Sequence, residues 1–180
     1  MKKLIILDRD GVINYDSDAY IKSPDEWIPL PGSLEAIARL TQAGYLIAVA
    51  SNQSGIARGL YTEATLTQIH NKMLAAITAV GGKISGIFHC PHQPADHCDC
   101  RKPKPGLLQR IAKTFQMPLT NVLFIGDKSS DLAAAENAGC QPVLVRTGYG
   151  EQTLIKVSDL KIPVFADLAE AVDAILAGKL

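Results

Sequence analysis

Long apolar runs are absent from this 180-residue sequence, and so is any excess of charge of one sign. A helix that crosses a bilayer needs roughly 20 apolar residues in a row, whereas the apolar run at positions 4–7 stops at Asp8. Lysine plus arginine and aspartate plus glutamate number 18 each, so the formal net charge is zero. A neutral chain without a basic stripe does not suit a polyanion-binding surface. We therefore expect a cytoplasmic protein with neither nucleic acid nor membrane as a partner.

Cysteine is also scarce, with four residues in the chain, but three of them lie at positions 90, 98 and 100. In a reducing compartment such a cluster favours a metal site over a disulfide. Three thiolates and one further ligand suit tetrahedral zinc, and without a fourth cysteine in the loop that ligand would be a histidine or a carboxylate. Four protein ligands leave no open position, so the site would be structural. The remaining cysteine, Cys140, is expected to be a small buried hydrophobic residue.

The sequence does contain a regular alternation of short apolar runs with stretches whose apolar residues recur at helical spacing. The length and the 47% hydrophobic content suit one domain over residues 1–180. Strands are predicted at 4–7, 45–50, 84–89, 122–125, 142–145 and 164–165, and helices at 33–43, 62–80, 105–115, 129–138 and 167–176. Ser33 and either Ser129 or Ser130 are predicted N-caps. Because strand and helix alternate, we predict an α/β fold with a mostly parallel sheet and helices on both faces.

The first predicted strand ends in two carboxylates, Asp8 and Asp10, and Gly11 follows them. In an open α/β sheet, ligands bind beyond the carboxyl ends of the strands. The glycine allows the chain to turn, so both carboxylates could approach one metal ion or substrate. The alternative is a solvated, aspartate-rich turn, but such a turn does not need so apolar a strand before it. The segment 14–31 is expected to form a loop that could lie over the strand ends.

Two further predicted strands end in polar residues, namely Ser51 with Asn52, and Asp127 with Lys128. A fourth polar group, residues 101–105, opens a helix with three cations. Because parallel strands end at the same edge of a sheet, these groups are predicted to converge. They would supply carboxylates for a hard cation, hydroxyl and amide donors, and cations for an anion. That combination is the equipment of Mg²⁺-assisted phosphoryl transfer.

Over nearly its whole length the chain resembles the haloacid dehalogenase-like phosphotransferases. The four motifs of that family correspond to Asp8-x-Asp10-Gly11, Ser51-Asn52-Gln53, Lys102 and Gly126-Asp127. Within the family, the resemblance is closer to the D-glycero-D-manno-heptose 1,7-bisphosphate phosphatases, whose signatures look like residues 8–14, 51–59, 90–92 and 98–103. The resemblance implies a Rossmann-like sheet with short loop inserts and no large cap domain.

The resemblance also implies a role for each catalytic residue. Asp8 would attack phosphorus and form an aspartyl phosphate, while Asp10 would protonate the leaving alkoxide and then activate water. Ser51 and Lys102 would hold the transferring phosphoryl oxygens. Mg²⁺ would be bound by the carboxylates of Asp8 and Asp127 and by the backbone carbonyl of Asp10.

By the same resemblance, the substrate would be a sugar bisphosphate that loses its C7 phosphate. The residues expected to contact it are Asp16, Ser17, Asp18, Tyr20, Ser51, Asn52, Gln53, Ser54, Arg101, Lys102 and Lys128. The loop 90–102 would hold zinc through Cys90, His92, Cys98 and Cys100, where His92 is the histidine that fits the family pattern. Because Cys100 precedes two of the cations, zinc would fix the backbone that carries them.

Three other functions are weighed against this one. Histidinol-phosphate phosphatase is a close relative that also carries a Cys/His zinc loop. A polynucleotide 3′-phosphatase has motifs that resemble residues 51–59, but the neutral charge weighs against it. A zinc-stabilised binding module without catalysis is disfavoured because Asp8, Asp10, Lys102 and Asp127 are all present. We expect a monomer that acts on a small molecule.

Overall fold

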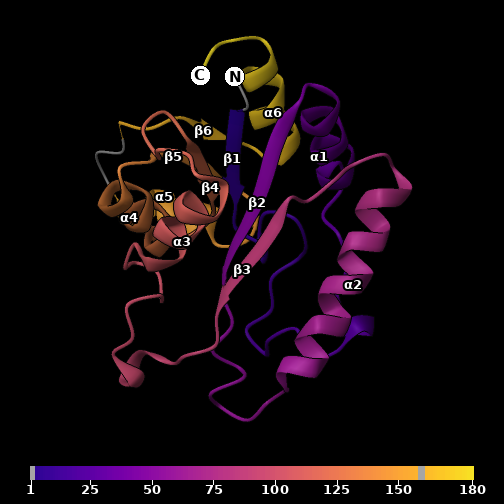
Figure 1. Cartoon of the computed structure of the whole chain (residues 1–180), viewed down its shortest axis with the longest axis vertical. Coiled ribbons are helices and arrows are strands. Elements are labelled where there is room, and N and C mark those ends of the chain that lie inside the picture. The colour runs from indigo at the N-terminus through magenta and orange to yellow at the C-terminus, as the bar shows by residue number, and fades with distance from the viewer. Residues whose placement is uncertain (1–2, 158–160) are drawn as a thin grey trace.

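The computed structural model describes residues 3–157 and 161–180, which form a six-stranded sheet with helices packed on both faces (Figure 1). The strands are β1 (Lys3–Leu7), β2 (Tyr45–Asn52), β3 (Gly86–Cys90), β4 (Leu123–Gly126), β5 (Gln141–Val145) and β6 (Val164–Phe165). The α-helices are α1 (Ser33–Gln42), α2 (Glu63–Ala79), α3 (Gly106–Phe115), α4 (Ser129–Ala138), α5 (Gly150–Lys156) and α6 (Leu168–Leu176). None of the helices in these described ranges is long and apolar enough to cross a membrane.

All neighbouring strands pair in parallel, in the spatial order β3-β2-β1-β4-β5-β6. From β1 the chain winds outward to β3, returns to the centre of the sheet, and winds the other way from β4 to β6. The direction reverses between β1 and β4, where Leu7 pairs with Ile125. Such a reversal opens a crevice beyond the carboxyl ends of the two strands. The predicted α/β, Rossmann-like fold is confirmed, and the crevice lies where the first motif begins.

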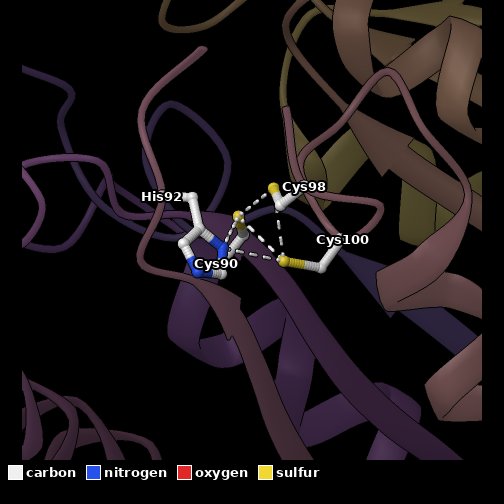
Figure 2. A group of neighbouring side chains, drawn as sticks. All are labelled: Cys90, His92, Cys98 and Cys100. Carbon is white, nitrogen blue, oxygen red and sulfur yellow. Dashed lines mark hydrogen bonds between the residues drawn. The ribbon is translucent and has the colours of Figure 1, made fainter. Parts of the chain in front are cut away.

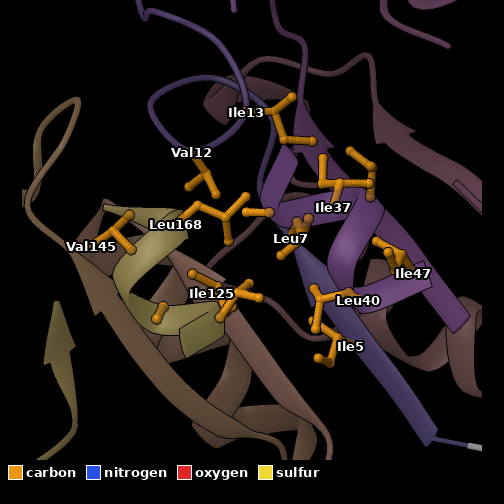
Figure 3. Close-up of a cluster of buried hydrophobic side chains, with 14 of the residues drawn as sticks. Ile5, Leu7, Val12, Ile13, Ile37, Leu40, Ile47, Ile125, Val145 and Leu168 are labelled. Atoms are coloured by element: carbon orange, nitrogen blue, oxygen red, sulfur yellow. The ribbon is translucent and has the colours of Figure 1, made fainter. Parts of the chain in front are cut away.

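Two apolar layers hold the sheet, because alternate residues of a strand point to opposite faces. Ile5 and Leu7 of β1 pack in the layer that includes α1, α2 and α6, and Figure 3 shows them with Ile37 of α1. Leu4 and Ile6 pack in the opposite layer, against α3 and α4. Burying a side chain of this size contributes about 1.5–3 kcal/mol. Because β1 is buried on both faces, the residues that follow it leave the sheet from a rigid position.

Both predicted N-caps are wrong. Gly32 is the N-cap of α1, with a φ of 75°, and Ser33 instead donates its hydroxyl to the carbonyl of Ile13 at 2.6 Å. Lys128 occupies the N-cap position of α4, and its backbone N–H donates to the Asp131 carboxylate at 3.0 Å. In each case the serine lies in the first helical turn and not before it. The Ser33 hydroxyl is used in a tertiary contact, and at α4 the Asp131 carboxylate, a stronger acceptor, takes the capping hydrogen bond.

Helix α5 was not predicted, because its apolar residues do not match its buried face. Ile155 is 80% exposed, whereas Gly150 and Thr153 are buried. Cys140 is buried, as predicted. The side chain of Trp27, in the loop after β1, is buried in the layer with α1 and α2.

Candidate active site

Asp8 follows β1 directly and is held by a buried lysine. Nζ of Lys102 lies 2.9 Å from Oδ1 of Asp8 and 2.6 Å from Oδ1 of Asp131. It also donates to the carbonyl of Ala50 at 2.8 Å, and the Lys102 side chain is only 2% exposed. The backbone N–H of Arg9 donates to the same oxygen of Asp8 at 2.8 Å. Among the residues that the structure describes, the contacts of this carboxylate converge on Oδ1, which leaves Oδ2 for an incoming group.

Asp131 belongs to the site but was not among the predicted residues. Its Oδ1 pairs with Lys102, and its Oδ2 accepts hydrogen bonds from the backbone N–H groups of Asp127 at 3.2 Å and Lys128 at 3.0 Å. An acidic residue in the first turn of a helix is a recognised capping signal. Reading the sequence after Asp127 for such a signal would have found it. Because one oxygen caps the helix, the other is held in place to orient the lysine.

Three carboxylates, those of Asp8, Asp127 and Asp131, meet beyond β1 and β4, with one oxygen from each within 4.8 Å of the others. Burial raises the pKa of Asp8 to about 6, and the charge of Asp131 adds to that shift. Burial also raises the pKa of Asp127 to about 9, although the Lys128 ammonium opposes it. Buried carboxylates this close repel one another, so the arrangement favours a bound cation. The carboxylate of Asp10 is not in this cluster.

Two glycines enclose the Asp127 carboxylate. A Cβ atom on either Gly11 or Gly148 would lie 2.2 Å from Oδ2 of Asp127, and both glycines have positive φ angles, of 87° and 59°. The backbone N–H of Tyr149 donates to the same oxygen at 2.8 Å. Two loops therefore approach this carboxylate with bare backbone, a packing that a side chain would prevent. Asp127 itself is fully buried.

Four donors surround the Asp10 carboxylate. Oδ1 accepts from Nε of Arg9 and Nδ2 of Asn14, both at 2.9 Å. Oδ2 accepts from Nη2 of Arg9 and Nε2 of Gln53, both at 3.0 Å. Burial alone would raise the pKa of Asp10, but the charge of Arg9 and these hydrogen bonds outweigh burial and lower the pKa below its ordinary value of 3.8. The carboxylate is therefore held ionised in one orientation.

The residues at the end of β2 were predicted to contact substrate, but two of them also hold other site residues. Asn52 donates to the backbone carbonyl of Lys102 and accepts from its N–H, both at 3.1 Å. Nε2 of Gln53 donates to the hydroxyl oxygen of Ser51 at 2.7 Å, as well as to Asp10. The Asn52 amide is thus a clamp on the backbone of the buried lysine.

A cavity of about 670 Å³ opens at this edge of the sheet, within the size range of small-molecule sites. It is lined by all of the residues predicted to act in catalysis or to bind substrate: Asp8, Asp10, Asp16, Ser17, Asp18, Tyr20, Ser51, Asn52, Gln53, Ser54, Arg101, Lys102 and Lys128. The convergence predicted from the parallel strands is therefore present in the structure.

One wall of the cavity is formed where the loop after β1 meets the loop after β5. Nζ of Lys128 lies 2.6 Å from Oδ2 of Asp16 and 3.3 Å from each Asp127 oxygen. The same ammonium lies 4.9 Å from the ring centroid of Tyr149, whose hydroxyl contacts Asp18. Burial would lower the pKa of Lys128, but the surrounding carboxylates raise it, so this cation stays charged. Tyr149 was not predicted, since nothing in its sequence context distinguishes it.

The zinc ligands predicted in the loop after β3 also converge (Figure 2). The three Sγ atoms are separated by 3.6 Å (Cys90–Cys98), 3.1 Å (Cys90–Cys100) and 3.6 Å (Cys98–Cys100). Nδ1 of His92 lies 3.6 Å from Sγ of Cys90 and 3.3 Å from Sγ of Cys100. Tetrahedral zinc with Zn–S bonds of about 2.3 Å separates its ligand atoms by roughly 3.5–3.8 Å. Three of the five separations fall in that range, and the two that join Cys100 to Cys90 and to His92 are shorter. The four atoms are therefore gathered at close to the spacing of zinc ligands, and the sulfurs are too far apart for disulfides.

Residues 99–171 match the HAD-hydrolase-like family. The chain is 56% identical to the D-glycero-beta-D-manno-heptose-1,7-bisphosphate 7-phosphatase of Pseudomonas putida over 93% of this chain and 95% of that protein. It is 59% identical to the protein of the same name from Bordetella bronchiseptica, over 84% of this chain and 85% of that protein.

A solved structure agrees with these relatives. The D,D-heptose 1,7-bisphosphate phosphatase from B. bronchiseptica, in complex with magnesium and phosphate, superposes with a TM-score of 0.96 at 53% identity. The superposition covers 98% of this chain and 99% of that one. By sequence and by fold, this chain belongs to the family of D-glycero-beta-D-manno-heptose-1,7-bisphosphate 7-phosphatases, within the HAD-like hydrolases.

Proposed function

We propose that this protein is a Mg²⁺-dependent phosphatase that removes the C7 phosphate of D-glycero-D-manno-heptose 1,7-bisphosphate through an aspartyl-phosphate intermediate. The observation that carries the proposal is the position of Asp8, which lines the cavity beside a buried lysine and, among the described residues, keeps its Oδ2 clear of contacts. The names of the relatives specify the beta anomer, which is therefore the first substrate to test.

The residues around Asp8 fit a magnesium ion. The carboxylates of Asp8 and Asp127 and the backbone carbonyl of Asp10 would hold it, because oxygen ligands of this kind are those that Mg²⁺ prefers. The glycines that enclose Asp127 and the raised pKa values of Asp8 and Asp127 support a cation there. When bound, Mg²⁺ would neutralise charge so that an anionic carboxylate can approach an anionic phosphate.

The chain's own residues account for both halves of the reaction. Oδ2 of Asp8 attacks phosphorus, and the bond from phosphorus to the C7 oxygen breaks as that oxygen takes a proton from Asp10. A bound phosphate raises the pKa of a neighbouring carboxyl group, which favours the protonated form of Asp10 at this stage. Asp10 then takes a proton from the water that attacks phosphorus. Asp8 is released as a carboxylate together with inorganic phosphate.

The transferring phosphoryl group is held by Lys102 and Ser51, which line the cavity together with Asp8. The sugar lies against two groups of residues: the loop after β1 with Lys128, and the residues after β2 with Arg101. The guanidinium of Arg101 donates to the carbonyl of His92 at 3.2 Å, so this cation is tied to the cysteine-rich loop. A guanidinium suits a second phosphate because it can donate two parallel hydrogen bonds.

Structural zinc in the loop 90–102 is the second metal of the proposal. Burial raises the pKa of the Cys90 thiol, whereas hydrogen bonds, the largest from the Arg101 N–H, overcome burial and lower the pKa of Cys98 to about 7. Zinc binding requires thiolates, which the metal itself stabilises. We propose that residues 1–180 form one domain that contains this loop, and that the protein acts as a monomer because this chain supplies all of the proposed catalytic and substrate-binding residues.

The test is a phosphate-release assay with purified protein and Mg²⁺. We expect kcat/KM for heptose 1,7-bisphosphate to exceed that for histidinol phosphate by a wide margin, with heptose 1-phosphate as the product. A 3′-phosphorylated oligonucleotide should release no phosphate, and the Asp8→Asn variant supplies the background. Comparable or higher kcat/KM on histidinol phosphate would replace the proposed substrate by that alternative. An absence of turnover on every compound would favour a binding module.

A further inference from the structure

Arg9 lies between the two catalytic aspartates in the sequence, and its side chain is one of the largest that is fully buried, with 1% exposure. A buried guanidinium is costly unless its donors are satisfied. Here they contact both oxygens of Asp10, Oε1 of Gln53 at 3.4 Å, and Nε2 of His70 at 3.3 Å. The mechanism above assigns this arginine no part, although its partners include the proton-transfer group.

The pairing of Arg9 with Asp10 is bidentate. Nε and Nη2 each donate to a different carboxylate oxygen, at 2.9 and 3.0 Å. Two parallel hydrogen bonds from a planar fork fix the plane of a carboxylate, as well as its distance. Lysine, a point charge on a flexible stem, can supply the charge but not this orientation.

His70 of α2 anchors the fork from the far side. Since Arg9 can only donate, Nε2 of His70 accepts, and the ring proton is then on Nδ1. Burial, together with the charge of Arg9, lowers the pKa of His70 to about 3, so the ring stays neutral and can accept this bond. The ring lies beside that of His89, with the centroids 6.0 Å apart, and His89 pairs with Glu63 at 3.0 Å. The anchor therefore packs against a second histidine that is itself paired with a carboxylate.

A second set of hydrogen bonds, through Tyr61 and Gln53, reaches the Asp10 carboxylate. The hydroxyl of Tyr61 donates to Oε1 of Gln53 at 2.6 Å, which fixes the amide so that its nitrogen donates to Oδ2 of Asp10 at 3.0 Å. Arg9 thus donates to both oxygens of Asp10, and Gln53 donates to Oδ2 as well. Such a shell holds a side chain within the narrow range of angles that proton transfer requires.

We propose that Arg9 is a positioning residue that aims the carboxyl group of Asp10 at the leaving-group oxygen, with His70 as the anchor of its guanidinium. This inference rests on the proposed role of Asp10 as general acid. It predicts a selective defect: variants of Arg9 should be impaired where the leaving group needs a proton and much less where it does not.

The test compares an alkyl with an aryl phosphate. An alkoxide leaving group needs a proton from Asp10, whereas 4-nitrophenolate leaves without one. The value of kcat/KM includes only the steps up to transfer of the phosphoryl group to Asp8, so later hydrolysis does not enter. The ratio of the two kcat/KM values is independent of the fraction of protein that is correctly folded. Wild type, Arg9→Lys, Arg9→Met and Asp10→Asn are measured with 4-nitrophenyl phosphate and with any sugar phosphate that wild type turns over.

General acid catalysis contributes roughly 10²–10⁴-fold, so Asp10→Asn sets the full decrease in the alkyl-to-aryl ratio. We expect Arg9→Lys to lower the ratio about 10-fold and Arg9→Met about 10²-fold or more. His70→Leu should lower it in the same direction by a smaller factor. Arg110→Lys, on the exposed face of α3, is the matched control and should leave the ratio unchanged.

Equal losses on both substrates, or no loss on either, would overturn the positioning role of Arg9. A lower ratio in Arg9→Lys with an unchanged ratio in His70→Leu would overturn the anchor. A wild type that hydrolyses other sugar phosphates better than heptose bisphosphate would contradict the proposed substrate but leave this comparison intact. Should Arg9→Met be too unstable for kinetics, a crystal structure of Arg9→Lys supplies a second measurement. There the Asp10 carboxylate should have rotated from its wild-type plane, and an unmoved carboxylate would refute the proposal.

Discussion

Replacing Cys100 with serine tests the zinc proposal and the link between zinc and catalysis. Sγ of Cys100 is 3.1 Å from Sγ of Cys90 and 3.3 Å from Nδ1 of His92, so it is central to the proposed tetrahedron. A serine hydroxyl is a poor replacement for a thiolate on zinc. Cys100→Ser should therefore lose tightly bound zinc and loosen the loop between β3 and α3, while the rest of the sheet stays folded.

The size of the catalytic effect follows from how Lys102 is held. Zinc would fix the backbone two residues before Lys102, and Asn52 independently clamps the Lys102 peptide with two hydrogen bonds. Hydrogen bonds of this kind contribute about 1 kcal/mol each, so Asn52 retains part of the geometry when zinc is lost. A displacement of about 1 Å of a catalytic group costs on the order of 10²-fold in rate. We therefore expect kcat/KM to fall by about 10- to 100-fold, or roughly 1.4–2.8 kcal/mol.

The assay combines metal analysis by mass spectrometry with phosphate release at saturating Mg²⁺. Wild type purified without chelators should contain one zinc per chain, distinct from exchangeable magnesium. Cys140→Ala is the matched control, because this cysteine is buried outside the cluster, and it should keep both zinc and kcat/KM. Full activity in zinc-free wild type would refute the reasoning. So would a disulfide among the three clustered cysteines, or zinc bound by Asp8 and Asp127.

Other predictions concern single residues. Asp8→Asn should abolish turnover, since an amide cannot form the acyl phosphate, and near-native activity of this variant would exclude the covalent route. Asp10→Asn should lower turnover by about 10²-fold or more, with the fold intact by circular dichroism. Asn52→Ala removes the clamp on Lys102 and should lower kcat/KM about 10-fold with zinc retained by metal analysis, whereas unchanged kcat/KM would mean that the loop alone holds the lysine. Burial lowers the pKa of His70 from 6.5 to about 3, so below pH 6.5 the unfolded chain binds a proton that the folded chain does not. The contribution of His70 to the free energy of unfolding is therefore complete above pH 6.5 and is lost as the pH drops toward 3. From pH 7.5 to pH 5 this group should cost about 2 kcal/mol in urea unfolding, and His70→Gln should lack that increment; an equal loss in both proteins would contradict the buried neutral ring.

Much of the fold could be predicted from the sequence, because burial leaves a pattern that periodicity detects. The run at residues 4–7 is apolar throughout, and the structure buries it on both faces of β1. Helix α2 shows apolar residues at helical spacing, and Leu66, Ile69, Met73 and Ile77 are buried. Helix α5 was missed for the converse reason: its seven residues bury a glycine and a threonine, so no apolar pattern marks it.

The location of the site could also be predicted, since parallel strands end at one edge and the polar residues follow the strands. The residues predicted to act in catalysis or to bind substrate line one cavity, and family membership agrees with the motifs that predicted it. The cysteine cluster converges as expected from its composition, with Nδ1 of His92 near two of the sulfurs.

Which partner each side chain takes was decided by the tertiary structure. Asn52 and Lys102 are 50 residues apart in the chain, and Arg9 and His70 are 61 apart. Composition and periodicity report whether a residue is buried, but they do not report which distant residue lies beside it. The sequence therefore predicts Asn52 only as a substrate contact and indicates no role for Asp131 or Arg9. These hydrogen bonds join the loop after β1 to α2, and the end of β2 to the segment before α3, and only the folded sheet brings these distant segments within 3–3.5 Å of one another.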